Sequence, residues 1–336
     1  MRKGMANGPV KQMHSRHVDT TFYRYDPRFG FWGIPDIEMD VSFRLRPDVY
    51  IRCRHNEEGN RDKPCTAARM KSPILCLGGS HTWGVGIEQE DRYTDYLEQM
   101  TGRPVLNLGH CSLGLDQICL VILETAERYK PSAVVVEQYP WAIHRVLNTY
   151  VNGYTRPYFQ IDARGDLQLR KMPALARYRA CRRLIGAYYS YLKELREFQA
   201  GINLKEGYDP WADPIFLSWK TPYYDYMYRL VEKITGVMQD FCRQRGIHLL
   251  FGLGAIMQQF GGKSPSALID YDLPRNRLLS VLGSNRVACV DMTEAMMREH
   301  RDDDPVIFKD GHMNAKGHRI FAGEIRREME SRGWLH

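Results

Sequence analysis

The sequence predicts an α/β protein, a three-layer α/β/α sandwich built around a mainly parallel five-stranded sheet. Two observations predict it. Five short runs are almost continuously apolar, which is typical of strands that helices cover on both faces. Helical patterns of apolar residues lie between these runs, and a strand followed by a helix and another strand requires a crossover connection that leaves the two strands parallel.

The five predicted strands are the apolar runs 74–77, 105–108, 133–136, 247–253 and 287–290. Ligands of open parallel sheets bind beyond the carboxyl ends of the strands. Ser80 follows the first run, Gly109 follows the second, and the segment 138–141 follows the third. We therefore expect a ligand site where these three segments meet.

Four helices are predicted from apolar side chains that recur at spacings of three and four. Pro131 and Gly246 end the second and the third helix, and Asn314 is available to cap the last one. The apolar positions are Tyr93, Tyr96, Leu97 and Met100 in the first helix; Leu115, Ile118, Cys119, Ile122, Leu123 and Ala126 in the second; Met227, Leu230, Val231, Ile234, Met238 and Phe241 in the third; and Phe321, Ile325 and Met329 in the last.

Composition limits the classes of function. The 336 residues carry a formal net charge of +7, a modest excess that argues against nucleic acid as a partner. No run approaches the roughly 18 consecutive apolar residues that cross a bilayer, and the first residues lack the apolar segment of a secretory signal. We therefore expect no membrane span and a cytoplasmic location. Cys53, His55 and Cys65 lack the paired short spacing of zinc ligands, so no metal site is predicted.

Two segments fall outside the repeating pattern. Residues 1–70 are rich in arginine, aspartate, proline and aromatic residues, and we expect an irregular or β-rich extension packed on a core domain of residues 71–336. An insert at about 153–222 contains a strongly cationic helical stretch that includes Arg182 and Arg183. These cations form either a solvated helix face or a lid that meets a phosphate-bearing substrate or carrier.

The stretch GGSHTWG, residues 78–84, places Ser80 after the first predicted strand on backbone that two glycines make flexible. A serine hydroxyl is a weak nucleophile near neutral pH, so it needs a base and donors that hold an oxyanion. Taken alone, Ser80 would equally cap the helix that follows. A nucleotide-binding loop is not supported, because the spacing is not Gly-x-Gly-x-x-Gly and no Lys-Ser or Lys-Thr follows the glycines.

Candidates for the base and its partner stand near the C-terminus, in KDGHMNAKGH, where one glycine separates Asp310 from His312. In extended backbone, residues two apart face the same way. We therefore expect the Asp310 carboxylate to reach one ring nitrogen of His312 and to fix its tautomer. The other ring nitrogen is then free to face Ser80.

Together these motifs resemble the SGNH or GDSL-like hydrolases, from residue 71 to the end and apart from the insert. GGSHTWG stands where that family has Gly-Asp-Ser followed by a Thr and a Gly. NLGHCSLGLDQ supplies the second-block glycine, Gly109, and DGHMNAKGH supplies the aspartate and histidine before the final helix. YDPRFGFWGIPD and HNEEGNRD also look like the N-terminal extension of some bacterial members.

The resemblance implies a role for each matched residue. Ser80 would attack an ester or related acyl carbon, and its own amide would join the Gly109 amide in the oxyanion hole. His312 would act as the base, and Asp310 would orient it. No cofactor is implied.

Two positions depart from the family pattern. Gly79 replaces the first-block aspartate, which removes a polar anchor beside the nucleophile. The third-block asparagine has no counterpart in VVVEQYPWAIHR, and losing one oxyanion donor typically costs about 3 kcal/mol of barrier. Gln138 is the expected substitute through its amide. His81 is expected at the substrate, and Trp141 would either pack in the core or line an acyl pocket.

Three functions follow as alternatives. The first is an esterase or thioesterase that uses Ser80, His312 and Asp310. The second is an acyltransferase that moves an acyl group from a CoA or carrier-protein donor to an alcohol or amine, and the cationic insert favours it. The third is a catalytically weakened descendant that binds a ligand or partner, which Gly79 and the absent asparagine favour.

Overall fold

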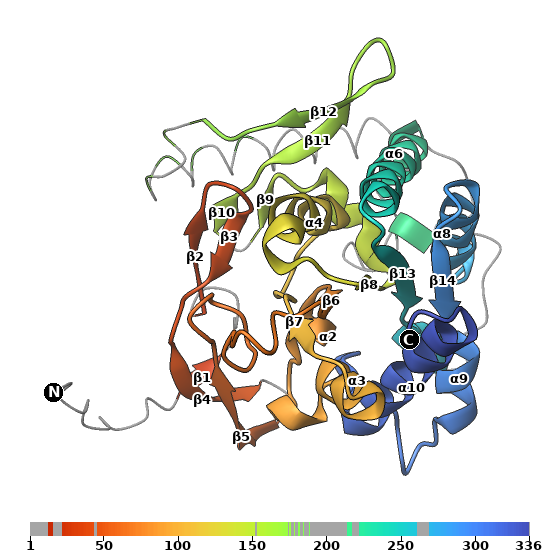
Figure 1. Ribbon diagram of the computed structural model, residues 1–336. Helices are drawn as coiled ribbons and strands as arrows, with labels where there is room; N and C mark the ends of the chain where they lie inside the picture. Colours follow the sequence, from red (N-terminus) through yellow and green to blue (C-terminus); the bar gives the residue numbers. More distant parts are fainter. Residues whose placement is uncertain are drawn as a thin grey trace, which may run out of the picture.

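A computed structural model describes residues 13–15, 22–43, 46–151, 153–173, 175, 178, 181, 184, 188, 214–216, 222–260 and 269–335. Its central sheet has five strands, and every neighbouring pair is parallel (Figure 1). The predicted parallel sheet is therefore confirmed. In spatial order the strands are β14 (Ala288–Asp291), β13 (His248–Leu253), β8 (Ala133–Gln138), β6 (Ile74–Leu77) and β7 (Val105–Asn107).

The strand ends differ from the apolar runs by one or two residues, except in β6. The largest difference is in β8, which continues past the apolar run to include Glu137 and Gln138. Both residues pair with β13 and are buried. Backbone pairing with a long neighbouring strand therefore sets this end, and side-chain polarity does not.

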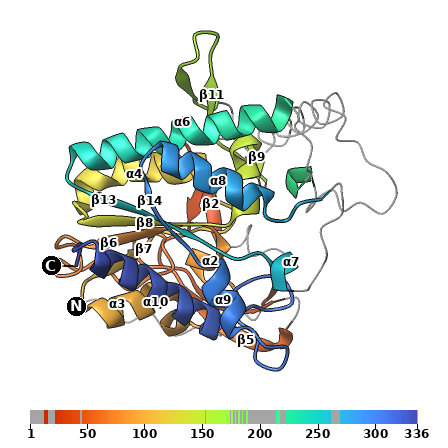
Figure 2. The same cartoon turned by 90° about the vertical axis from the view of Figure 1, so that its right-hand side faces the viewer.

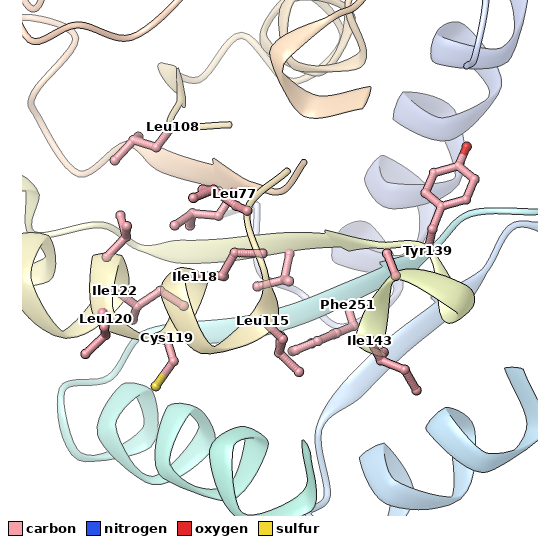
Figure 3. Packing of buried hydrophobic residues seen from close by; sticks show 14 of the residues in the cluster. Leu77, Leu108, Leu115, Ile118, Cys119, Leu120, Ile122, Tyr139, Ile143 and Phe251 are labelled. Atoms are coloured by element: carbon pink, nitrogen blue, oxygen red, sulfur yellow. The ribbon is translucent and has the colours of Figure 1, made fainter. Parts of the chain in front are cut away.

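Helices cover both faces of the sheet, which confirms the three-layer α/β/α sandwich (Figure 2). Figure 3 shows Ile118 and Ile122 directed from α4 toward the strands, near Phe251. The opposite face has its own buried cluster, which includes Leu250 and Phe321. One layer holds α4 (Leu115–Tyr129), α6 (Pro222–Gln244) and α8 (Leu273–Ser284), and the other holds α3 (Tyr93–Thr101), α9 (Thr293–Glu299) and α10 (Ala315–Ser331).

The N-terminal residues form strands beside the central sheet (Figure 1). A hairpin of β2 and β3 contributes buried aromatic side chains, among them Tyr23 and Trp32, to the same apolar cluster as α4. A second unit pairs β4 with β5 antiparallel and with β1 parallel. The bounds are β1 (Met13–Ser15), β2 (Tyr23–Asp26), β3 (Gly30–Gly33), β4 (Glu38–Phe43) and β5 (Arg46–Arg54).

Two buried arginines join the N-terminal residues to the central sheet. Arg61 is fully buried, and its guanidinium donates to the carbonyl oxygens of Trp83, Gly84 and Ile87, which follow the first strand of the sheet. Arg92 donates to the Arg61 carbonyl and forms an ion pair of 2.7 Å with Asp95. Because a buried guanidinium is costly unless it is paired and hydrogen-bonded, these contacts hold the two parts together firmly.

Short antiparallel strands stand at the start of the insert: β9 (Tyr150–Val151) lies just before it, and β10 (Tyr154–Thr155), β11 (Tyr158–Ile161) and β12 (Leu167–Arg170) lie within it. The β11–β12 hairpin contacts α6, where the Tyr226 hydroxyl accepts from the Ile161 amide at 3.2 Å. Three short elements complete the description: η1 (Gln89–Asp91), η4 (Pro214–Phe216) and α7 (Met257–Phe260). Among the described helices, none is long and apolar enough to span a bilayer.

Candidate active site

The sheet has a reversal of strand order at β6, which lies between β7 and β8. The chain passes from β6 to one neighbour and then crosses back to the other. In open parallel sheets, the carboxyl ends of the strands at such a reversal border a crevice in which ligands bind. Ser80 follows β6, the loop 108–114 follows β7, and Tyr139 follows β8 at this edge.

A short helix, α2 (Ser80–Trp83), begins at the candidate nucleophile. The residue two positions before it must be glycine, because a Cβ on Gly78 would lie 2.1 Å from Thr82 Oγ1 and 2.3 Å from Glu137 Oε2. Packing does not require glycine at position 79 in the same way, because a Cβ there would meet only Arg145 Nη1, at 3.2 Å. Close packing under the turn raises the Ser80 side chain to the edge of the sheet.

The structure brings the three predicted residues together. Ser80 Oγ and His312 Nε2 lie 2.8 Å apart, although 232 positions separate the two residues in the sequence. His312 Nδ1 lies 3.2 Å from Asp310 Oδ1, which is ion-pair range, but the approach is not aligned for a hydrogen bond. The side chains of His312 and Asp310 are 25% and 33% exposed, so a substrate can reach the group from solvent.

Asp310 and His312 meet through a tight turn and not through the extended backbone that we expected. The Phe308 amide donates to the His312 carbonyl at 2.7 Å, and Gly311 between the two residues has a φ of 88°, in the left-handed region that glycine tolerates. The Asp310 carboxylate also accepts from the His312 amide at 3.0 Å. Asn314 then caps α10 by accepting from the Gly317 amide, which confirms the predicted cap.

Glu137 anchors the nucleophile turn, and the motifs did not reveal it. Its Oε2 accepts from the Gly79 amide and from the Thr82 hydroxyl, each at 3.0 Å. Burial raises the pKa of Glu137, while these hydrogen bonds and the Arg145 charge act in the opposite direction. The polar anchor that Gly79 lacks is therefore supplied by β8. A carboxylate directly after the apolar run AVVV was the signal for it.

The Gly109 amide was expected to be an oxyanion donor, but in the structure it donates to Asn107 Oδ1 at 2.9 Å. Asn107 in turn donates to the Thr82 carbonyl at 2.6 Å, which ties the loop after β7 to α2. A Cβ on Gly109 would lie 2.5 Å from two carbon atoms of Thr82. Glycine is therefore needed here for close approach of the two segments.

Ser112, in the same loop, has a φ of 66°, a conformation that residues with side chains seldom adopt. Within the described part of the chain, its backbone N–H makes no hydrogen bond. The neighbouring Leu113 carbonyl accepts from Arg145 Nη1 at 3.3 Å, and that nitrogen borders Gly79, the residue before Ser80. Arg145 thus links the loop after β7 to the turn before Ser80, and the strained Ser112 in that loop is a candidate for a functional role.

Gln138 also differs from its expected role. Its side chain is 4% exposed, and its amide nitrogen donates to the Tyr139 carbonyl at 2.9 Å. The amide is held against the backbone of the next residue, so it does not replace the missing asparagine in this conformation. On η2 (Pro140–Leu147), which follows β8, Arg145 Nη1 would lie 3.2 Å from a Cβ built on Gly79.

His81 lies buried behind the catalytic histidine candidate. Its ring stacks on Tyr139 with centroids 3.9 Å apart, and it lies 4.9 Å from the His312 ring. The Met313 amide donates to His81 Nδ1 at 3.3 Å, which places the ring proton on the other nitrogen. Burial, and next the His312 charge, lower the pKa of His81, so the ring is neutral. This placement favours holding the His312 loop over touching substrate.

Trp141 is half-buried on η2, against the main apolar cluster, and the Arg145 guanidinium lies 5.2 Å from its ring centroid. Tyr139 precedes it with its ring turned away from Ile143 (Figure 3). Arg182 and Arg183 lie outside the described residues. Over the described ranges, no three His, Cys, Asp or Glu side chains gather closely enough to hold a metal ion.

No family model matches the sequence, and no curated protein matches it. Similar solved structures include an acetyl xylan esterase, AlAXEase, at 12% identity and a TM-score of 0.42, covering 76% of this chain and 98% of that one. A member of the lipolytic protein G-D-S-L family from Veillonella parvula is similar at 11% identity and 0.39, covering 76% and 96%. The psychrotrophic esterase EstA from Pseudoalteromonas is similar at 9% and 0.38, covering 78% and 98%. The roles of the residues in this chain therefore depend on the geometry of its own site.

Proposed function

We propose that the chain is a serine hydrolase of the GDSL-like type that cleaves an acyl ester or thioester through Ser80, His312 and Asp310. The observation that carries this proposal is the 2.8 Å approach of Ser80 Oγ to His312 Nε2 at the carboxyl edge of a parallel sheet. A nucleophile within hydrogen-bond reach of an imidazole, with a carboxylate behind the imidazole, is the arrangement that acyl transfer to serine requires.

In the first half of the reaction, Ser80 Oγ attacks the acyl carbon while its proton passes to His312 Nε2. The imidazolium that forms is stabilised by the Asp310 carboxylate, 3.2 Å from Nδ1. Negative charge develops on the carbonyl oxygen, and in this proposal the amides of Ser80 and Ser112 donate to it. The tetrahedral intermediate then collapses, and the departing alcohol or thiol takes the proton from His312.

In the second half, water replaces the leaving group. His312 Nε2 accepts a proton from water, and the hydroxide attacks the acyl carbon bound to Ser80. Collapse of the second tetrahedral intermediate releases a carboxylic acid and returns the proton to Ser80 Oγ. The neutral His81 beside His312 adds no second charge during these steps, because burial lowers its pKa.

A fluorophosphonate probe tests the nucleophile directly. The wild-type protein is expected to be labelled on the peptide that carries Ser80, and Ser80→Ala is expected to remain unlabelled. Ser284→Ala, an exposed serine at the end of α8, is the matched control and should label like the wild type. Equal labelling of the wild type and Ser80→Ala would remove Ser80 as the nucleophile.

Turnover then separates hydrolysis from the alternatives. A hydrolase should release acid from p-nitrophenyl acetate or an acyl thioester in buffer alone, with His312→Ala strongly impaired. A protein that is labelled but releases acyl groups only after an alcohol or amine is added is an acyltransferase. A protein that binds such esters and is never labelled is a binding protein, and the hydrolase proposal then fails.

A further inference from the structure

Arg145 lies beside the turn that carries Ser80. Its Nη1 would lie 3.2 Å from a Cβ built on Gly79, so the guanidinium borders the peptide that leads into Ser80. The same nitrogen donates to the Leu113 carbonyl at 3.3 Å, one residue beyond the Ser112 amide. Arg145 therefore touches both segments that carry the backbone donors.

The backbone of Arg145 is held in place from the protein interior. The fully buried guanidinium of Arg156 donates to the Arg145 carbonyl and to the Asn148 carbonyl, at the two sides of the last turn of η2. Arg156 is in turn paired with the buried Asp116 at 3.2 Å. These contacts fix the backbone from which the Arg145 side chain extends, and transition-state stabilisation requires donors that are held in place before the reaction.

We propose that Arg145 is the third donor of the oxyanion hole and stabilises the negative charge that develops on the carbonyl oxygen when Ser80 attacks. This inference rests on the proposed function. A guanidinium carries five N–H donors in a planar fork, so one Arg side chain can hold the Leu113 carbonyl and a substrate oxygen at the same time. No co-reactant is needed, because Arg145 keeps its proton throughout the reaction.

The glycine at position 79 fits this role. A side chain there would fill the space that the guanidinium occupies beside the nucleophile turn, and Gly79 leaves it open. The electrostatic effect of Arg145 already reaches the site. Its charge contributes, after burial and the charges of His312 and His318, to the lowered pKa of His81, and it opposes the effect of burial on the pKa of Glu137.

Two variants of Arg145 test the role of its charge. Arg145→Met keeps an apolar stem against Trp141 and removes all donors, so both the rate of fluorophosphonate labelling and kcat for p-nitrophenyl acetate should fall about 100-fold or more, with little change in KM. Arg145→Lys keeps a point charge but loses the planar guanidinium, so its rates should lie between those of the wild type and Arg145→Met. Arg245→Met, directly after α6, which also loses a cation over an aromatic ring, is the matched control and should keep wild-type rates.

Chemical rescue separates a donor from a merely structural residue. Guanidinium ion at millimolar concentration should restore part of the kcat of Arg145→Met and leave the wild type unchanged, with ammonium as the less effective comparison. A structural defect would not respond to a small cation in this way. The melting temperatures of the variants are measured alongside, and Arg145→Lys carries the test if Arg145→Met does not fold.

The outcomes distinguish this inference from the function on which it rests. Absence of Ser80 labelling in the wild type overturns the proposed function. Labelling of Ser80 with equal rates in wild type and Arg145→Lys or Arg145→Met overturns only the role of Arg145. A loss confined to esters that carry a carboxylate or phosphate, with neutral p-nitrophenyl acetate unaffected, would assign Arg145 to binding substrate charge and would also overturn the inference.

Discussion

Glu137→Ala removes the carboxylate that accepts from the Gly79 amide and the Thr82 hydroxyl. All three residues are buried, so water does not take the place of the lost acceptor. A buried donor left without a partner costs about 1–3 kcal/mol. The Gly79 amide is such a donor, whereas the Thr82 hydroxyl keeps Tyr93 Oη at 3.1 Å as a partner, so we expect a loss of about 1–3 kcal/mol in the free energy of unfolding. Labelling of Ser80 should slow as well, because both donors belong to the turn that carries it.

Glu137→Gln is the sharper companion, because it keeps an acceptor oxygen and removes the titrating group. Burial raises the pKa of Glu137 above its ordinary value of 4.5 in the folded protein. Between the two pKa values the folded state binds more protons than the unfolded state, so the carboxylate contributes less stability as pH rises. The stability of the wild type relative to Glu137→Gln should therefore decrease as pH rises from 4.5.

Urea denaturation at a series of pH values, followed by fluorescence, measures both effects. Glu137→Ala should have a much lower transition midpoint than the wild type at each pH, and Glu137→Gln should lie closer to it. A Glu137→Ala protein as stable as the wild type would refute the anchoring role. A difference between wild type and Glu137→Gln that does not vary with pH would refute the desolvation of the carboxylate.

Three further predictions concern the packing of the loop after β7 and the buried His55. Gly109→Ala should cost about 1–3 kcal/mol in the free energy of unfolding, because its Cβ would lie 2.5 Å from Thr82 carbons. Gly283→Ala on α8 is the control and should be neutral or stabilising, because nothing lies within 4 Å of its Cβ. Equal midpoints of the two variants in urea would contradict this prediction. Ser112→Val should lower the melting temperature and slow labelling, because a β-branched residue resists a φ of 66°, while Ser112→Gly should not lower it. Burial lowers the pKa of His55 from 6.5 to about 3, so between these pH values the unfolded state binds a proton that the folded state does not. The wild type should therefore lose stability relative to His55→Gln as pH falls through this window, by up to about 1.4 kcal/mol per pH unit. Parallel curves of stability against pH for the two proteins would contradict the prediction.

The layers of the fold could be predicted because buried parallel strands are written as apolar runs, and the amphipathic helices between them repeat every three or four residues. The sequence did not predict the helix α8, because it lacks a broad apolar face. Among its residues only Pro274, Leu278 and Leu282 are buried, which is too narrow a stripe to stand out from the rest of the segment. Periodicity therefore finds an element only when a broad face of it is covered.

Motifs also predicted some features around Ser80 and not others. Ser80, Asp310 and His312 could be named because each stands in a short local motif, and the structure places them together. The contacts of Gly109 and Gln138 could not be read from motifs, since a side-chain oxygen of Asn107 and a neighbouring carbonyl decide where their N–H groups go. Such choices depend on the three-dimensional packing of several loops, which spacing along the chain does not encode.

The guanidinium of Arg61 closes the carboxyl end of the short helix that begins at Ser80, although it belongs to the first 70 residues of the chain. Trimming the protein to its sandwich would therefore remove a contact that supports the turn carrying Ser80. Under the proposed function, mutation or proteolysis of this leading segment would lower activity without altering Ser80, His312 or Asp310.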